Sequence, residues 1–136
     1  MKSMKEIYNL SYDTSNFNSG LVNWYNQMID KTYEELNSTD VSKMIRQNIL
    51  KEVAEKKIIE LFVKDPYDGE FNDGGLLKII ISLNFKAEDI QDFEKFRNFL
   101  IQTKNEYEKF DWSDEQTKIE YGNNITKLMN QLGIKI

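Results

Sequence analysis

Apolar side chains recur every three or four positions along most of this chain, which is the spacing of one face of an α-helix. The first clear stripe predicts a helix from about residue 19 to residue 30, and it consists of Leu21, Trp24, Tyr25, Met28 and Ile29. A Trp and a Tyr on such a stripe indicate packing in a core, because aromatic rings bury large apolar areas. Residues 1–18 are mixed and polar, and we expect a short helix or an irregular lead-in there.

The apolar stripe returns after a short helical turn that we expect at residues 32–36. Thr39 or Asp40 is predicted to cap the next helix, because either side chain can accept a backbone N–H of its first turn. Helical spacing then continues to Lys64. The apolar face shifts between residues 48 and 51, which predicts a break in the helix at that point.

The segment after Lys64 contains the chain's only proline. Asp65-Pro66 is predicted to end the helix, since the residue before a proline is pushed out of the helical region. Gly69 and the Gly74-Gly75 pair can accept positive φ. We therefore predict a tight, shaped loop over residues 66–73.

The second half of the chain also predicts helices. Residues 76–83, L-L-K-I-I-I-S-L, have a length that fits either a short buried helix or a buried strand. No second strand candidate is available to pair with them, so we predict a helix. A longer helix is expected at residues 87–109, with Glu88 and Asp89 in its first turn, where the helix dipole favours acidic side chains.

The last helix has its own start and stop signals. Ser113 and Gln116 have the spacing of a capping box, in which each side chain satisfies the other residue's backbone amide. Residues 122–124, Gly-Asn-Asn, are expected to interrupt this helix, and Gly133 is expected to end it. The prediction for residues 1–136 is an all-α fold, a single compact domain of about six helices.

Composition excludes several classes of function. The chain has no cysteine, which excludes disulfides, thiolate metal sites and thiol nucleophiles, and it has no histidine, the usual general base near neutral pH. Its net charge of −5 disfavours nonspecific nucleic-acid binding, which requires a basic surface. No secretory signal and no apolar run long enough to span a bilayer is visible, so we expect a cytoplasmic protein without a membrane or nucleic-acid partner.

Acidic clusters are the remaining candidates for chemistry. Asp111, Asp114 and Glu115 would support carboxylate catalysis only in a pocket that raises one pKa. A second set, which offers the oxygen ligands that Mg²⁺ prefers but fits no calcium-loop pattern, is Asp68, Glu70 and Asp73. With 23 acidic residues in the chain, such adjacency is expected by chance. We interpret both sets as solvated acidic surface and predict no enzymatic activity, no cofactor and no metal.

Arg46 and Gln47 lie close to the apolar stripe, between Ile45 and Ile49. An arginine at the edge of a core needs a paired carboxylate, and the acidic loop at residues 65–73 is the obvious source. We predict that Arg46 and Gln47 fasten that loop to the helix. Direct contact of the two side chains with a partner protein is the alternative.

The stretch from residue 40 to residue 77 resembles the immunity proteins of bacterial contact-dependent growth inhibition systems. The family pattern is a D-V-x-x-x-I-R-Q helix, an apolar helix that ends in Asp/Glu-Pro, and a loop that ends in D-G-E-L-L. The positions that match it are Asp40, Val41, Ile45, Arg46, Gln47, Pro66, Asp73, Gly74, Leu76 and Leu77. Gly75 departs from the pattern, because it stands where the family has Glu. The resemblance implies a small helical cytoplasmic protein that binds and blocks the toxic C-terminal domain of a cognate effector, often a nuclease.

An acidic surface suits such a partner, because a nuclease has a basic substrate groove in which carboxylates can stand in for phosphates. The first candidate surface comes from the loop and comprises Asp65, Asp68 and Glu70. The second comprises Asp111, Asp114 and Glu115, with Trp112 as a possible aromatic anchor. Functions of other classes stay open, namely a carboxylate-based metal-dependent hydrolase and a general all-α adaptor or regulator.

Overall fold

The computed structural model describes residues 1–15, 19–69 and 73–135 of the chain. These residues form seven α-helices and three short 3-10 helices, and within them the only extended pairing is a single bridge between Ser3 and Thr32. The α-helices are α1 Met4–Tyr8, α2 Gly20–Ile29, α3 Ser38–Gln47, α4 Lys51–Lys64, α5 Gly75–Ser82, α6 Phe93–Glu106 and α7 Glu115–Gln131. The 3-10 helices are η1 Tyr33–Glu35, η2 Ala87–Asp89 and η3 Tyr107–Lys109. The predicted all-α fold is confirmed, including the choice of helix for α5.

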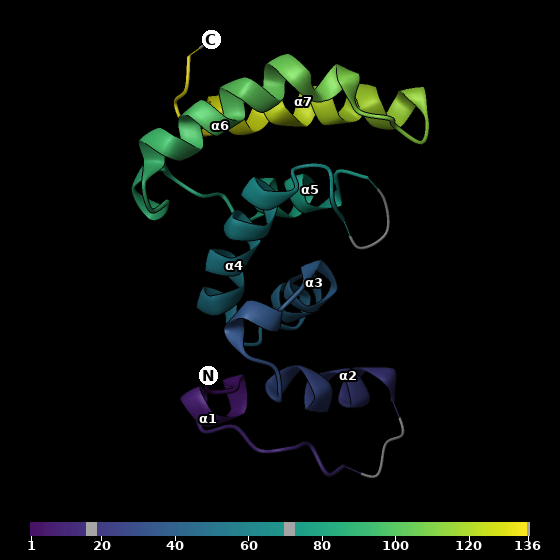
Figure 1. Ribbon diagram of the computed structural model, residues 1–136, viewed down its shortest axis with the longest axis vertical. Coiled ribbons are helices and arrows are strands. Elements are labelled where there is room, and N and C mark those ends of the chain that lie inside the picture. Colours follow the sequence, from purple (N-terminus) through teal and green to yellow (C-terminus); the bar gives the residue numbers. More distant parts are fainter. Residues whose placement is uncertain (16–18, 70–72, 136) are drawn as a thin grey trace.

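The helices are stacked along the long axis of the molecule (Figure 1). The α1–α2 pair lies at one end and the α6–α7 hairpin at the other, so the two termini are far apart. Between them α3 packs on α4, while α5 packs on both α4 and α7. The buried apolar side chains form one cluster that runs from Met4 to Ile134. A single hydrophobic core therefore connects the two ends.

The start of α3 differs from the prediction. Asn37, not Thr39 or Asp40, is the N-cap, and its side chain accepts the backbone N–H of Asp40 at 2.9 Å. Asp40 is the third residue of the helix, and its carboxylate accepts the backbone N–H of Asn37 in return. The N-cap thus lies two or three residues earlier than expected.

The predicted break between α3 and α4 is confirmed. Asn48 and Leu50 both take left-handed conformations, with φ of 55° and 46°. The backbone N–H of Ile49 reaches back to the carbonyl of Met44 at 2.9 Å, which satisfies a carbonyl at the end of α3. The chain therefore turns sharply and lays α4 against α3.

The predicted helix at residues 87–109 is wrong in extent. The chain forms η2, then leaves helical geometry until α6 begins at Phe93, and the last three residues of the range form η3. Asp92 sits at φ 52° and caps α6 by accepting the backbone N–H of Lys95. Ile90 is 7% exposed and packs into the core. Burial of Ile90 and the left-handed Asp92 thus replace the continuous helix that periodicity favoured.

The last helix corrects two further predictions. Asp114, not Ser113, is the N-cap of α7, and it accepts the backbone N–H of Thr117 at 2.7 Å. The helix runs unbroken through residues 122–124. Gly122 serves close packing instead, because a Cβ at this position would overlap the Tyr107 ring, 2.6 Å from its Cζ. Gly133 ends the helix as predicted, at φ 74°.

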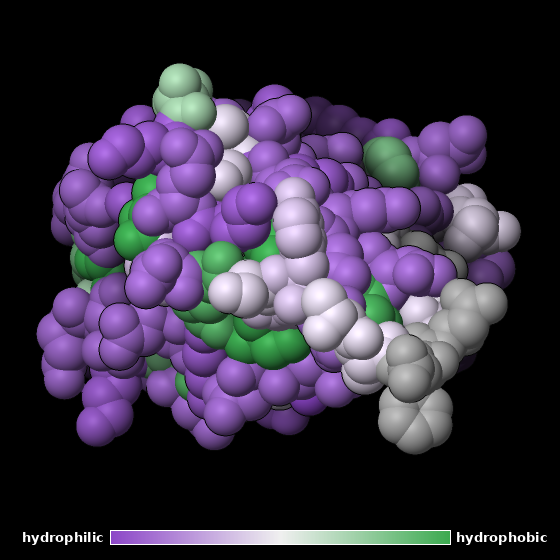
Figure 2. Space-filling model, turned by 90° about the horizontal axis from the view of Figure 1, so that it is seen from below, coloured by the Kyte–Doolittle hydropathy of each residue, from purple (hydrophilic) through white to green (hydrophobic). Residues whose placement is uncertain are grey.

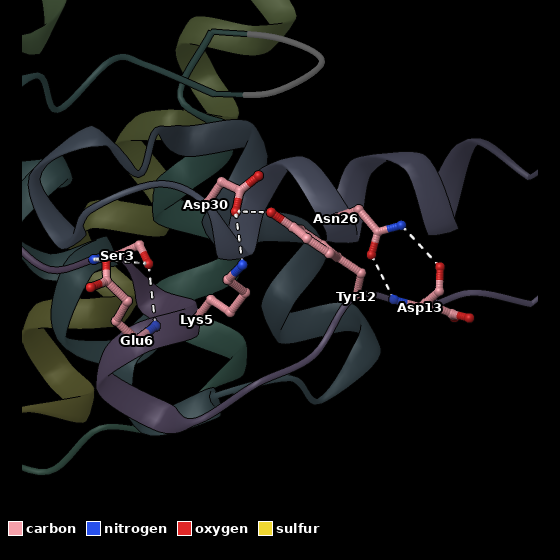
Figure 3. A network of polar contacts seen from close by, with 7 residues as sticks. All are labelled: Ser3, Lys5, Glu6, Tyr12, Asp13, Asn26 and Asp30. Carbon is pink, nitrogen blue, oxygen red and sulfur yellow. Dashed lines mark hydrogen bonds and ion pairs between the residues drawn. The ribbon is translucent and has the colours of Figure 1, made fainter.

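The N-terminal arm is tied to α2 by polar contacts (Figure 3). The Tyr12 hydroxyl donates to Asp30 at 2.7 Å, and the Lys5 ammonium lies 4.0 Å from the same carboxylate and 4.2 Å from the centre of the Tyr12 ring. Asp13 and Asn26 exchange two hydrogen bonds, one in each direction. Of the two alternatives expected near the N-terminus, a short helix or an irregular lead-in, the structure has the short helix, α1, and the arm that follows it is held by α2.

The α1–α2 end of the molecule carries a largely hydrophilic face on which some apolar surface remains visible (Figure 2). The exposed large hydrophobic side chains of α1, the arm and α2 are Ile7, Tyr8, Tyr12 and Leu21. This end keeps apolar side chains in contact with solvent.

Candidate interaction surface

An aromatic cluster joins the loop after α4 to the turn before α7. Tyr67 of the loop stacks on Phe110 at a ring-centroid distance of 4.3 Å and meets Trp112 edge-on at 5.4 Å. Tyr121 of α7 lies 5.5 Å from Tyr67 and 4.8 Å from Trp112. We call these four residues, Tyr67, Phe110, Trp112 and Tyr121, the aromatic cluster. It places the two acidic segments side by side although more than forty residues separate them.

Hydrogen bonds hold the aromatic cluster in register. The Tyr121 hydroxyl donates to the carbonyl of Pro66 at 2.8 Å, and the Trp112 indole N–H donates to the carbonyl of Tyr107 at 2.7 Å. Gly74 lies against the same rings, since a Cβ at this position would stand 2.6 Å from Cδ2 of Tyr121. Its φ of 79° confirms the predicted left-handed glycine, whereas Gly75 is the first residue of α5. Gly74 is thus needed both for its backbone conformation and for its missing side chain.

The predicted partner-binding acids that the structure describes lie on the two segments that this cluster joins. Asp65 is exposed at the end of α4 and accepts the backbone N–H of Tyr67 at 3.2 Å, while Asp68 is half-buried and accepts the backbone N–H of Gly69 at 2.8 Å. Glu70 lies outside the described residues. The loop acids that can be placed therefore shape the loop as well as charge it.

The acids of the turn before α7 are exposed. Asp114 caps the helix, and its pKa lies below the usual value because Thr117 donates hydrogen bonds to the carboxylate. Glu115 lies 3.9 Å from Lys118. Asp111 forms neither a hydrogen bond nor an ion pair with any described residue, so its charge faces solvent.

Burial and nearby carboxylates raise the pKa values of two tyrosines of the cluster, Tyr67 and Tyr121. Burial raises the pKa of Tyr67, and the nearby carboxylates of Glu106 and Asp65 raise it further. Burial likewise raises the pKa of Tyr121, with smaller effects from Tyr67 and Asp65. Glu106, on the last turn of α6, thus belongs to the same acidic surface and was missed from the sequence. The signal in the sequence that could have pointed to this part of the surface was the density of aromatic residues beside both acidic segments.

Trp112, which the sequence suggested as an aromatic anchor for the partner, already makes contacts within the chain. Its ring is half-buried among the other three residues of the aromatic cluster, and its N–H is already used within the chain. Its role as an anchor stays a prediction.

Three residues of the sequence pattern, Asp40, Arg46 and Gln47, lie in α3. Asp40 is 2% exposed and accepts hydrogen bonds from the indole N–H of Trp24 at 3.0 Å and from the Lys31 ammonium at 2.7 Å. Arg46 and Gln47 are exposed in the last turn of α3, where a cation suits the helix dipole. The pairing of Arg46 with the loop stays a prediction, because residues 70–72 of that loop lie outside the described part.

The other pattern residues belong to the loop. Pro66 offers its carbonyl to Tyr121, Gly74 takes the left-handed turn, and Asp73 is half-buried just before it. Across the described residues no three acidic side chains gather in a way that could hold a metal ion. In the same residues no helix has the length and apolar character required to cross a membrane.

Comparison with known proteins places the chain in a family. A family model described as CDI immunity proteins, where CDI is contact-dependent growth inhibition, matches residues 6–97. No curated protein matches the chain. The matched range contains the whole stretch from residue 40 to residue 77 and stops within α6, before the turn at residues 107–115. Because the match covers more than half of the 136 residues, the chain belongs to the family of CDI immunity proteins.

Proposed function

We propose that this chain binds the C-terminal toxin domain of a cognate growth-inhibition effector in the bacterial cytoplasm and blocks it without catalysis. The toxin is a nuclease whose basic substrate groove receives the acidic surface around the aromatic cluster. The observation that carries the proposal is the meeting of two acidic segments, at residues 65–68 and 111–115, on one rigid aromatic base.

The geometry suits a protein that acts by charge. Asp65 and Asp111 are exposed, and Glu106 adds a third carboxylate near Tyr67. Such a surface steers a basic partner into contact and raises the rate of association. At physiological ionic strength, salt screens the attraction between exposed charges that are more than about 8 Å apart. The aromatic cluster keeps the carboxylates in place, so little ordering is needed on binding.

The test uses the C-terminal domain of the large protein encoded immediately upstream of this chain's gene. Binding is measured by calorimetry and by stopped-flow association for the wild type and for Asp111→Lys. The matched control is Glu34→Lys, which changes net charge equally at an exposed site in η1, beside Thr32, which forms a bridge with Ser3 at the start of α1. We expect Asp111→Lys to weaken binding about tenfold, mostly through a slower association rate, and Glu34→Lys to change it little.

Asp65→Asn is a milder probe, because the amide oxygen can still accept the N–H of Tyr67 while the charge is lost. Equal effects of Asp111→Lys and Glu34→Lys would show that only net charge matters, and an unchanged Asp111→Lys would remove the turn from the interface. The blocking mechanism has its own test. An uncleavable oligonucleotide should compete with this chain for the toxin, and a stable ternary complex would contradict groove blocking.

A further inference from the structure

A groove of about 1000 Å³ runs between α4 and α6. Residues of the segment 83–92 also line it. None of the acidic residues assigned to the toxin surface lines this groove. It is therefore a concave feature distinct from the acidic residues assigned to the toxin surface, and it needs its own explanation.

The floor of the groove is apolar and firmly packed. Ile59 and Val63 of α4 and Phe99 of α6 are half-buried in it, and the buried Phe96 lies beside them. Phe99 meets the fully buried Phe62 edge-on at 5.6 Å, so the floor rests directly on the core. Side chains fixed in this way leave a preformed site, because neither helix must move to expose apolar area.

The rim of the groove is acidic. Its ionisable residues are Glu52, Glu55, Glu60, Asp89, Asp92, Lys56 and Lys95, a surplus of three negative charges in a chain whose net charge is −5. Several of these carboxylates accept hydrogen bonds, for example Glu60 from the Tyr33 hydroxyl at 2.8 Å and Asp89 from the backbone N–H of Lys86 at 2.9 Å. Those bonds hold the carboxylates in place around the opening.

Charge decides which occupant fits. A nucleic acid or an anionic lipid would meet like charge at the rim, and a second copy of this acidic chain would do the same. An apolar peptide segment flanked by Lys or Arg satisfies both parts of the groove, since its apolar side chains cover the floor and its cations meet the carboxylates.

We propose that the groove between α4 and α6 receives an apolar segment of the toxin domain that is flanked by lysine or arginine. This inference rests on the proposed function and adds a second contact to it. The acidic surface steers the toxin and blocks its groove, while the α4–α6 groove holds an anchor and slows dissociation.

The test fills the groove without removing any packing. Asn98 is exposed on α6 and lines the groove, so Asn98→Trp places an indole in the opening. Asn130→Trp is the matched control, because Asn130 is exposed on α7 and does not line the groove. Circular dichroism melts confirm that both variants fold. We expect Asn98→Trp to weaken binding of the upstream-encoded toxin domain roughly thirtyfold or more, the effect of losing one hot spot, and Asn130→Trp to leave it within about twofold.

A second measurement needs no variant. Methyl NMR of the wild-type chain, with the toxin domain titrated in, should shift the resonances of Ile59 and Val63. Unmoved methyl resonances, or equal affinities for Asn98→Trp and Asn130→Trp, would overturn the groove assignment. If Asn98→Trp weakens binding and Asp111→Lys does not, the groove is part of the toxin interface and the acidic surface is not. A wild-type chain that does not bind the toxin at all refutes the proposed function itself.

Discussion

Asp40 offers the sharpest test of how this fold is held together. Its carboxylate is buried where α2, the segment before η1 and the start of α3 meet. One oxygen accepts the Trp24 indole N–H, and the other accepts the Lys31 ammonium and the backbone N–H of Asn37. Three separate parts of the chain therefore depend on one side chain, and Asp40→Ala removes all of these acceptors at once.

The expected cost follows from the exposure of each donor. Trp24 is 8% exposed, so its orphaned indole N–H costs ~1–2 kcal/mol. The Lys31 side chain is 31% exposed, which lets water replace part of its ion pair, and that loss is ~1 kcal/mol. Asn37 is exposed, so its N–H adds only ~0.5 kcal/mol. The sum is about 3 kcal/mol, a large share of a typical stability of ~5–15 kcal/mol, and it lowers Tm by ~10 °C.

Asp40→Asn separates the charge from the shape. The amide oxygen can still accept the Trp24 N–H, but the amide NH₂ then faces the Lys31 ammonium, donor against donor. We expect a loss of ~1–2 kcal/mol for this variant. In a chain that already carries Lys31→Met, Asp40→Asn should cost less stability, because the opposing ammonium donor is absent.

The assay is urea unfolding followed by far-UV circular dichroism and Trp fluorescence at neutral pH. Glu34→Ala is the control for an exposed acid, with an expected change within ~0.5 kcal/mol. A loss below ~1 kcal/mol for Asp40→Ala would refute the central role of this carboxylate. Full stability with weakened toxin binding would instead move Asp40 into the interface.

Three further predictions test other contacts. Gly122→Ala should destabilise the chain by ~1–3 kcal/mol in thermal melts because its Cβ meets a tyrosine ring, whereas Gly20→Ala, with nothing within 4 Å, should be neutral or stabilising. The hydrogen-bonded Asp114 has a folded pKa below the 3.8 of the unfolded chain, so its charge stabilises the fold above that pH and the stabilisation is lost as pH falls through the folded pKa. The stability advantage of wild type over Asp114→Asn, in urea titrations at several pH values, should therefore disappear at acid pH, and a constant difference would contradict this. Tyr121→Phe removes the hydrogen bond to the loop carbonyl, which should cost ~1 kcal/mol and speed hydrogen exchange at Gly74, and unchanged exchange would show that the loop holds without it.

Local signals predicted most of the helices. Apolar periodicity located α2, α3 and α4, the lack of a partner strand favoured the helix at α5, and Asp65-Pro66 and Gly133 ended helices where expected. These features depend on residues three or four positions apart, so they can be read along the chain.

Local signals failed where a distant residue decided the outcome. Gly122 reads as a helix breaker, but it lies in the middle of α7 because the ring of Tyr107 occupies the space where a side chain would stand. Asp40 reads as a capping residue, yet its main partners, Trp24 and Lys31, come from before η1. Ile90 interrupts the helix predicted at residues 87–109, because its side chain is buried in the core where the chain is not helical.

The sequence by itself determined the fold class, the acidic charge, the lack of thiol and imidazole groups, and the family pattern between residues 40 and 77. These depend on composition and on neighbours along the chain. Only the tertiary structure decided that the loop at Asp65 and the turn at Asp111 form one surface, because stacking of Tyr67 on Phe110 brings them together. It alone also created the groove between α4 and α6, since a concave surface requires two helices whose spacing is set by the core between them.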